Sequence, residues 1–433
     1  MTEAEDHPVA RIAVPAVLRT GAPAAVLAAL PGARAVGGAV RDTLAGLPVQ
    51  DVDVAAPLPP EEIATRLRAA GLKVFETGLS HGTVTAVLDH QPVEVTALRR
   101  DVATDGRHAE VAWTTSWRED AARRDFTINA MSLDEHGDLF DYFGGREDLA
   151  RGLVRFVGDP ATRLREDSLR ILRFFRFHTR YGRGEPDAAA VAAIRAAIPG
   201  LARLSVERVW MELKRILAAP DPTGAAALMQ ATGVLGAVVP HRTSLPDLRR
   251  LLELGGPAEP LLRLVALLPE RPAPRALARR LKASTEEQAL LDLLSQARHA
   301  EEPRPGALAS PAGAARIALH LGRTRFGEAR ARHVAACLLT LQALARPQSE
   351  VAHWVAARAM SDKLPLPVFP LGGADAMALG IEAGPRMGML LGGTREWWVD
   401  GGCVAGREAC LAELGRRIAE PDKEVGGAGQ GGV

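Results

Sequence analysis

Cysteine is scarce in this sequence. Cys337, Cys403 and Cys410 are the whole set among 433 residues, and no CxxC spacing occurs. So few thiols, odd in number, argue against both a disulfide framework and a zinc site. The first ten residues, MTEAEDHPVA, lack the basic and then apolar pattern of a signal peptide. We therefore expect a protein of the reducing cytoplasm.

Long apolar runs and an excess of one charge are also missing. No stretch of about 18 consecutive apolar residues occurs, so we expect no membrane span. Lys and Arg number 53 against 52 Asp and Glu, which gives a net charge of +1. The global charge therefore says nothing about nucleic acid, and a basic surface for RNA would have to be local. Aromatic residues make up only 4%, so the core must come largely from Ala, Leu and Val.

Two kinds of local pattern divide the chain. Helices are predicted at Glu61–Ala70 and, briefly, near Thr127–Met131, between short β-runs with turn residues at their ends. From about residue 160 the strand patterns disappear, and Ala-, Leu- and Arg-rich segments with helical periodicity follow. The fold class predicted is an α+β head followed by an all-helical remainder. The predicted strands are Ala33–Val36, Val52–Ala55, Lys73–Glu76, Thr83–Leu88, Val93–Leu98, Val111–Trp113, Leu139–Tyr142 and Val154–Phe156.

Two aspartates, Asp51 and Asp53, lie two residues apart in an apolar segment. Because side chains alternate along a strand, both carboxylates point to one face while the neighbouring valines point to the other. Close carboxylates repel each other unless a cation lies between them, and Mg²⁺ is bound by one or two carboxylates together with substrate phosphates. Glu94 is the best candidate for a third carboxylate from a neighbouring strand. The two aspartates would also fit a solvated strand edge.

A second motif, 36-VGGAVRD-42, joins a predicted strand to a helix through two glycines. Gly38 permits close approach to the backbone, and the N–H groups at a helix start favour phosphate. Arg41 can add charge-assisted hydrogen bonds to phosphate. The motif matches neither the GxGxxG nor the Walker pattern. Taken alone, it also fits an ordinary tight turn between a strand and a helix.

Asp167, Arg170, Arg173 and Arg176 step by three residues, so on a helix they would lie along one stripe. A guanidinium donates and a carboxylate accepts. Side by side, they match the base edge of cytosine or adenine, which presents a ring-nitrogen acceptor beside an amino donor. An Asp167–Arg170 pair would therefore accept C and A and reject G and U. The alternative is a solvated helix face with i,i+4 pairs such as Glu166–Arg170.

The region from about residue 35 to 215 contains six segments in a fixed order: 36-VGGAVRD-42, 50-QDVDVA-55, 122-ARRDFTINAM-131, 138-DLFDYFGGREDL-149, 166-EDSLRILRFFRF-177 and 204-LSVERVWMEL-213. They resemble the signature motifs of the class II tRNA nucleotidyltransferases, the CCA-adding enzymes of the polymerase-beta nucleotidyltransferase superfamily. The resemblance implies four parts. They are a head (residues 1–158), a neck with the base-recognition helix (159–220), a helical body (221–350), and a helical, tRNA-binding tail with a disordered C-terminus (351–433).

The resemblance also implies roles for single residues. Asp51 and Asp53 resemble catalytic carboxylates that bind Mg²⁺, and the strand pattern adds Glu94 to the catalytic set. Further residues resemble nucleotide contacts: Gly38 and Arg41 at the triphosphate, Arg124 in the RRD motif, Asp167 and Arg170 as the amino-acid template for the base, and Arg173 and Arg176 beside them. Glu207 and Arg208 resemble the motif that braces the neck.

The activity implied is the template-independent addition of CCA to the 3′ end of tRNA from CTP and ATP, by two-metal nucleotidyl transfer with release of pyrophosphate. The expected partners are the tRNA acceptor end and the two nucleotides, without a membrane or an obligate protein partner. The segment 99-RRDVATDGRHAEVAW-113 resembles the flexible loop that family members need to switch from C to A, although it also fits a plain hairpin. If it is that loop, it favours full CCA addition over addition of CC alone.

Two other functions stay open at this point. A bacterial poly(A) polymerase shares the head motifs but usually carries a basic extension, whereas the ends of this chain are acidic or glycine-rich. A non-catalytic RNA-binding protein built on a decayed head is the other, and the presence of Asp51, Asp53, Arg41 and Arg170 argues against decay.

Overall fold

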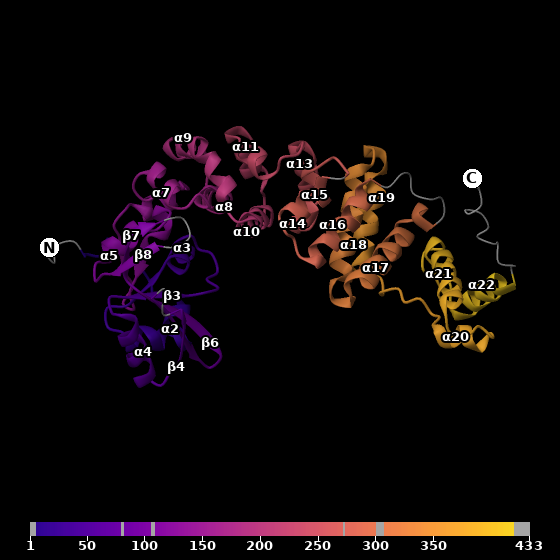
Figure 1. Ribbon diagram of the computed structural model, residues 1–433, viewed down its shortest axis with the longest axis horizontal. Helices are drawn as coiled ribbons and strands as arrows, with labels where there is room; N and C mark the ends of the chain where they lie inside the picture. The colour runs from indigo at the N-terminus through magenta and orange to yellow at the C-terminus, as the bar shows by residue number, and fades with distance from the viewer. Residues whose placement is uncertain (1–5, 79–81, 105–108, 272, 300–306, 420–433) are drawn as a thin grey trace, which may run out of the picture. The chain divides into compact units, whose positions relative to one another are not determined.

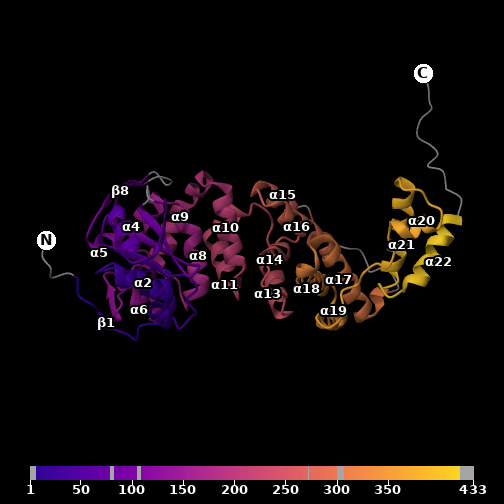
Figure 2. The same cartoon turned by 90° about the horizontal axis from the view of Figure 1, so that it is seen from below.

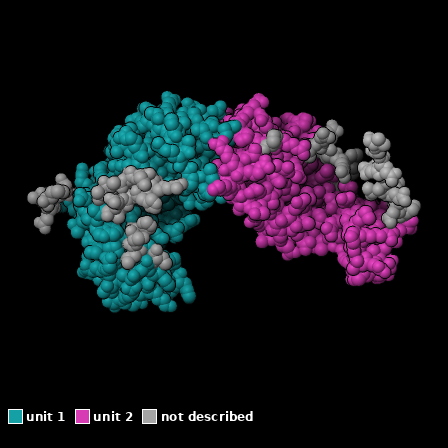
Figure 3. All heavy atoms as spheres, viewed as in Figure 1, with its two compact units in different colours: residues 1–240 teal, residues 241–433 magenta. Residues whose placement is uncertain are grey.

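The structure is a computed structural model that describes residues 6–78, 82–104, 109–271, 273–299 and 307–419. The chain divides into two units, residues 1–240 and residues 241–433 (Figure 3). All described strands lie in the first unit, and the described part of the second is helical (Figures 1 and 2). This confirms the predicted α+β head followed by helices. The boundaries of neck, body and tail stay predictions, and the expected disordered C-terminus lies outside the described residues.

A mixed sheet is the framework of the first unit. Over the described residues it has eight strands in the order β1-β10-β9-β2-β3-β6-β5-β4, and β7 and β8 form a separate antiparallel hairpin. β3 runs parallel to β6. The strands are β1 (Ala10–Arg11), β2 (Arg34–Val36), β3 (Asp53–Ala56), β4 (Lys73–Gly78), β5 (Thr83–Leu88), β6 (Gln91–Ala97), β7 (Arg99–Thr104), β8 (Ala109–Trp113), β9 (Met131–Leu133) and β10 (Asp138–Asp141).

Alternating side chains give the sheet one buried face. Val84 and Ala86 of β5 and Val93 and Val95 of β6 are buried, and helices α2 (Gly21–Ala29) and α4 (Pro60–Ala69) pack against these strands (Figure 1). The alternate positions, such as Glu94, point to the opposite face. Burial of the apolar face therefore fixes which side chains the sheet presents to a substrate.

Helix α8 (Arg170–Tyr181) is attached to the head by an aromatic cluster. The ring centroid of Phe156 lies 4.9 Å from that of Phe126 and 6.0 Å from that of Phe174. Phe177 lies 5.2 Å from Phe126, and all four rings are buried. The prediction of a strand at Val154–Phe156 is wrong. The segment makes one isolated bridge, from Phe156 to Phe126, because its apolar side chains pack against α8 rather than extend the sheet.

The first unit also contains the helices α1 (Ala16–Arg19), α3 (Gly38–Leu44), α5 (Trp117–Ala122), α6 (Gly145–Arg151), α7 (Pro160–Glu166), α9 (Ala188–Ala197), α10 (Val206–Leu217), α11 (Thr223–Thr232) and α12 (Val234–Val238). The predicted helix Glu61–Ala70 is confirmed as α4. Near Thr127–Met131 a helix was predicted, but a 3₁₀ turn at Thr127–Asn129 leads directly into β9. Pairing of β9 with both β2 and β10 outweighs the local helical pattern.

The second unit contains the helices α13 (Leu245–Glu253), α14 (Pro260–Leu267), α15 (Ala273–Arg280), α16 (Thr285–Arg298), α17 (Pro311–Phe326), α18 (Glu328–Ala345), α19 (Gln348–Ser361), α20 (Gly373–Ala378), α21 (Pro385–Asp400) and α22 (Arg407–Ala419). Among the residues that the structure describes, no helix has both the length and the apolar character needed to cross a bilayer. Cys337, Cys403 and Cys410 are all free and buried.

Candidate active site

The predicted carboxylates meet at the junction of two parallel strands. Asp53 is the first residue of β3, and its register partner on β6 is Glu94. Asp51 lies just before β3, and all three acidic residues are exposed while Val52 and Val54 are buried. The alternation predicted for this segment is therefore confirmed, with the strand beginning after Asp51.

Electrostatic repulsion among these acids is visible at Asp53. Although the Asp53 side chain reaches solvent, desolvation by the surrounding protein raises its pKa; the charges of Glu94 and Asp51 raise it further, while Arg124 opposes them. A hard divalent cation with oxygen ligands would relieve this repulsion. Among the described residues, no group of three or more His, Cys, Asp or Glu side chains is arranged to hold a metal ion. Asp51 and Asp53 are the residue types that bind Mg²⁺ in sites where one or two carboxylates act together with substrate phosphates.

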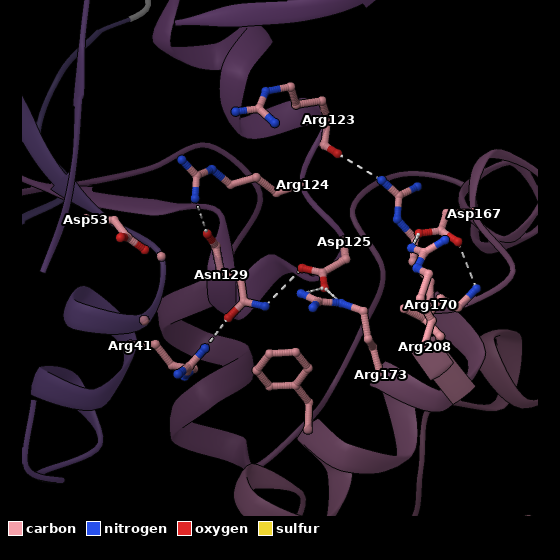
Figure 4. A pocket seen from close by; sticks show the side chains of 14 residues that line it. Arg41, Asp53, Arg123, Arg124, Asp125, Asn129, Asp167, Arg170, Arg173 and Arg208 are labelled. Carbon is pink, nitrogen blue, oxygen red and sulfur yellow. Dashed lines mark hydrogen bonds and ion pairs between the residues drawn. The ribbon is translucent and has the colours of Figure 1, made fainter. Parts of the chain in front are cut away.

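A cavity of about 420 Å³ lies beside Asp53 within the first unit (Figure 4). It brings together seven of the predicted site residues: Gly38, Arg41, Asp53, Arg124, Asp167, Arg170 and Arg173. Asp51, Glu94 and Arg176 are not among the described residues that line it. Six described arginines against three aspartates give the lining a positive balance, which suits a polyphosphate. Arg123, Asp125 and Arg208 also line the cavity, although none of them was predicted from the sequence to contact the nucleotide.

The turn before α3 requires glycine at position 37. Gly37 has φ 64° and ψ −118°, a conformation that L side chains rarely adopt. A Cβ there would also lie 3.3 Å from Nη1 of Arg124. At Gly38 a Cβ would meet only Nη2 of Arg41, at the ordinary distance of 3.6 Å. The first glycine of the motif therefore shapes the turn, and Gly38 begins the helix that carries Arg41.

Arg124 is positioned by Asp120, an acidic residue that was not among the predicted site residues. Asp120 on α5 is buried and forms ion pairs with Arg123 at 2.7 Å and with Arg124 at 3.0 Å. Burial raises the pKa of Asp120, but the two guanidinium groups outweigh that effect and hold the pKa below its usual value. The i,i+4 spacing of Asp120 and Arg124 on a helix was the available signal.

A buried polar chain links Arg41 to α8. Nη1 of Arg41 donates to Oδ1 of Asn129 at 2.5 Å, and Nδ2 of Asn129 donates to Oδ1 of Asp125 at 2.9 Å. Nε of Arg173 then donates to Oδ2 of Asp125 at 2.7 Å. Asp125 and Asn129 belong to the segment 122-ARRDFTINAM-131, but nothing in their spacing revealed that they connect Arg41 with Arg173.

The helix predicted to carry the arginine stripe begins later than expected. α7 ends at Glu166 and α8 begins at Arg170, so Asp167 is not on the helix that carries the three arginines. Asp167 is extended, with φ −149° and ψ 107°, and its Oδ1 accepts a hydrogen bond from the N–H of Leu169 at 3.0 Å. This local bond of an aspartate replaces helical pairing and breaks the helix. The stripe prediction is therefore wrong for Asp167 and holds for Arg170, Arg173 and Arg176.

Asp167 and Arg170 still line the same cavity, and each already has partners. Nη2 of Arg208 on α10 donates to Oδ2 of Asp167 at 2.7 Å. Arg170 forms an ion pair with Glu166 and donates to the carbonyl of Arg123 at 3.2 Å. The i,i+4 pair considered as an alternative is thus present together with exposure of Arg170 to the cavity.

Arg176 faces a different partner. Its Nε lies 2.6 Å from Oε2 of Glu212 on α10, and Glu212 is buried. This pair joins α8 to α10 away from the lining of the cavity. The predicted nucleotide contact of Arg176 stays a prediction.

The predicted flexible loop corresponds to the hairpin β7–β8. Its strands pair from Arg99 with Trp113 to Thr104 with Ala109. The tip, including Asp105, Gly106 and Arg107, lies outside the described residues. The role assigned to the loop stays a prediction.

Comparison with protein families gives the class of the fold. Residues 33–155 match the family described as "Poly A polymerase head domain", and residues 185–245 match "Probable RNA and SrmB- binding site of polymerase A". Together with the carboxylates and the arginine-rich cavity, these matches define a polymerase-type nucleotidyltransferase. Membership of such a family implies the use of divalent metal ions in general.

Comparison with individual proteins identifies the family within this class of nucleotidyltransferases. The mitochondrial CCA tRNA nucleotidyltransferase 1 of Mus musculus is 37% identical over 399 residues, which cover 88% of this chain and 86% of that protein. The CCA-adding enzyme of Geobacillus stearothermophilus is 40% identical over 201 residues, covering 46% and 48%. The crystal structure of the Bacillus stearothermophilus CCA-adding enzyme in complex with CTP is similar with a TM-score of 0.64 and 27% identity, covering 91% and 96%. The chain belongs to the CCA tRNA nucleotidyltransferase family.

Proposed function

We propose that this protein adds C, C and A to the 3′ end of tRNA, using CTP and ATP. The 3′-hydroxyl oxygen of the RNA forms a bond to the α-phosphorus of the nucleotide, the bond from that phosphorus to the bridging oxygen breaks, and pyrophosphate leaves. One observation carries the proposal: a single cavity contains Arg41 and Asp53 from the head together with Asp167, Arg170 and Arg173 from the helices that follow. Groups suited to triphosphate and groups suited to a base edge thus share one site.

Arg41 and Arg124 would bind the phosphates with charge-assisted hydrogen bonds. Asp120 orients Arg124, and Asn129 orients Arg41. Arg170 would donate to the ring nitrogen of cytosine or adenine, and Asp167 would accept from the amino group. Uracil and guanine present the opposite order of groups and would leave both residues unpaired, which costs about 1–3 kcal/mol for each contact.

Mg²⁺ is the divalent cation that we propose for the site, with Asp51 and Asp53 as its ligands and Glu94 as a further carboxylate. When bound, it would lower the pKa of the attacking hydroxyl and neutralise charge on the phosphates. The carboxylates of this chain hold negative charge at the start of β3, beside the arginine-lined cavity. A cytoplasmic location is also a proposal, because the mouse relative is named as mitochondrial.

The experiment uses purified protein and a tRNA that ends at the discriminator base. Sequencing of the RNA 3′ ends after incubation with CTP, ATP or both measures what is added. We expect two C residues with CTP alone and CCA with both nucleotides, and no incorporation by Asp51→Ala. A long A tract with ATP would instead support the poly(A) polymerase function, which the head-domain match makes the natural competitor.

A further inference from the structure

The sheet of the head carries an exposed aromatic side chain that the reaction described above does not use. Phe75 lies on β4, the last strand in the sheet order. Its side chain is 52% exposed. Single exposed apolar residues are common on protein surfaces, so the position of Phe75, rather than its exposure, carries the argument.

The strand register places Phe75 in line with the acidic residues. Phe75 pairs with Thr85 on β5, Thr85 pairs with Glu94 on β6, and Glu94 pairs with Asp53 on β3. Directly paired residues on neighbouring strands point to the same face. The four side chains therefore form one row across the face opposite α2 and α4. Neighbouring strands lie about 4.8 Å apart, so three spacings separate Phe75 from Asp53 by roughly 14 Å.

The chemistry of this row fits a single strand of RNA. Bases of any sequence stack on aromatic rings, and Phe75 offers such a ring. The reacting end of the RNA lies at Asp53 and Glu94 in the proposed function, so the row leads from that end to the ring of Phe75, where a base can stack. Lys73 lies two residues before Phe75 on β4 and therefore on the same face. It is exposed and places a positive charge within reach of the backbone.

We propose that Phe75 stacks on a base of the RNA 3′ strand a few nucleotides upstream of the reacting hydroxyl, and that Lys73 contacts a neighbouring phosphate. The proposal rests on the function proposed above. Stacking tolerates any base, which suits a substrate whose last bases change after every addition. One residue can thus hold the strand in all three steps, while nucleotide choice is left to the cavity.

The test measures KM for an RNA hairpin whose 3′ strand ends at the discriminator base. Phe75→Leu keeps an apolar side chain but removes the ring, and we expect KM for the RNA to rise about fivefold or more, with KM for CTP unchanged. Phe75→Trp should restore the wild-type KM. With 2-aminopurine placed along the 3′ strand, wild-type protein should quench fluorescence at one position, and Phe75→Leu should abolish that quenching.

Salt dependence separates the two residues. Lys73→Gln should lower the slope of log affinity against log salt concentration by about 1, whereas Phe75→Leu should leave the slope unchanged because stacking releases no counterions. Val9→Ala is the matched control. Val9 is 51% exposed and lies beside β1, at the other end of the same sheet. This control should change neither KM nor quenching, and all variants should keep the wild-type Tm.

Two results would overturn the inference in distinguishable ways. If wild-type protein extends the RNA and Phe75→Leu has the same KM and the same quenching, Phe75 does not stack on the substrate and the proposed function stands. If the wild-type protein neither binds nor extends the RNA, both proposals are wrong.

Discussion

Arg173 on α8 holds the buried carboxylate of Asp125 through two nitrogens, with Nη2 at 2.5 Å and Nε at 2.7 Å from Oδ2. The other oxygen of Asp125 accepts from Asn129, which in turn binds Arg41 (Figure 4). The proposed phosphate contact and the proposed base-recognition helix are thus joined by three consecutive polar contacts. A shift of α8 would therefore move Asp125 and Asn129 and change the position of Arg41.

Asp125→Asn should weaken both stability and nucleotide binding. Burial raises the pKa of Asp125, but the charge of Arg173 and the hydrogen bond from Asn129 outweigh it and keep the pKa below its usual value. Removing one charge of a buried pair costs about 3–5 kcal/mol, measurable by urea denaturation. We also expect a higher KM for CTP and for ATP. Glu147→Gln, which removes an exposed i,i+4 pair with Arg151, is the control and should change stability little.

Asp53→Asn should abolish nucleotide incorporation without lowering stability at pH 7. The folded protein binds a proton at Asp53 more tightly than the unfolded chain, because its pKa is raised above 3.8. Stability contributed by this group is therefore fully present below pH 3.8 and is lost as pH rises through the raised pKa of the folded protein. Asp120 and Asp125 have lowered pKa values and change stability in the opposite sense, so the measurement is the difference between the two proteins: from pH 3.5 to pH 7 the Tm of the variant should rise relative to that of wild type. A difference in Tm that does not change with pH would contradict the repulsion assigned to Glu94 and Asp51.

Chelation of divalent cations should stop incorporation and leave the fold intact. Since the carboxylates at β3 repel each other without a cation, we expect added Mg²⁺ to restore activity and to raise Tm. Glu94→Gln should shift the Mg²⁺ concentration for half-maximal activity upward by about tenfold. Glu62→Gln, an exposed change on α4, provides the comparison. An unchanged Mg²⁺ requirement in the Glu94 variant would remove Glu94 from the catalytic set.

Arg170→Ala should reduce the choice between nucleotides more than the rate with CTP. The loss of one donor at the base edge is expected to lower discrimination against UTP by about 10- to 100-fold. Competition assays with mixed nucleotides, followed by sequencing of the RNA ends, measure this ratio. Discrimination equal to wild type would show that Arg170 does not read the base.

Arg176→Ala should lower stability by about 1–3 kcal/mol, because it leaves the buried carboxylate of Glu212 with a weaker partner, Arg215 at 3.4 Å. Since Arg176 is not among the described residues lining the cavity, we expect KM for ATP to stay unchanged. A raised KM with unchanged stability would support the nucleotide contact predicted from the sequence.

Local sequence patterns were sufficient to predict the strands that bury one face. The strands β3, β5 and β6 follow from alternating valines, and the same alternation placed Asp53 and Glu94 on one face. The assignment of Arg41 and Arg170 to one protein function needed the order of several motifs, because neither residue is informative by itself.

The features that local sequence patterns did not predict depend on contacts between residues far apart in the chain. The helix break at Asp167 is stabilised by Arg208, which lies 41 residues further along the chain. The buried connection from Arg173 to Asp125 spans 48 residues. Neither pairing has a periodicity in the sequence. Val154–Phe156 has the apolar content of a strand, and only its packing against α8 shows that it is not one.

The internal partners of Asp167 and Arg170 have a consequence for accuracy. A base that pairs with Asp167 and Arg170 as proposed would compete with the bond from Arg208 to Asp167 and the bond from Arg170 to Glu166. Acceptance is therefore an exchange of hydrogen bonds, favourable only when the base returns as many as it removes. Errors would then depend on how tightly Glu166 and Arg208 compete with the base, so weakening these two competitors should make the enzyme more permissive.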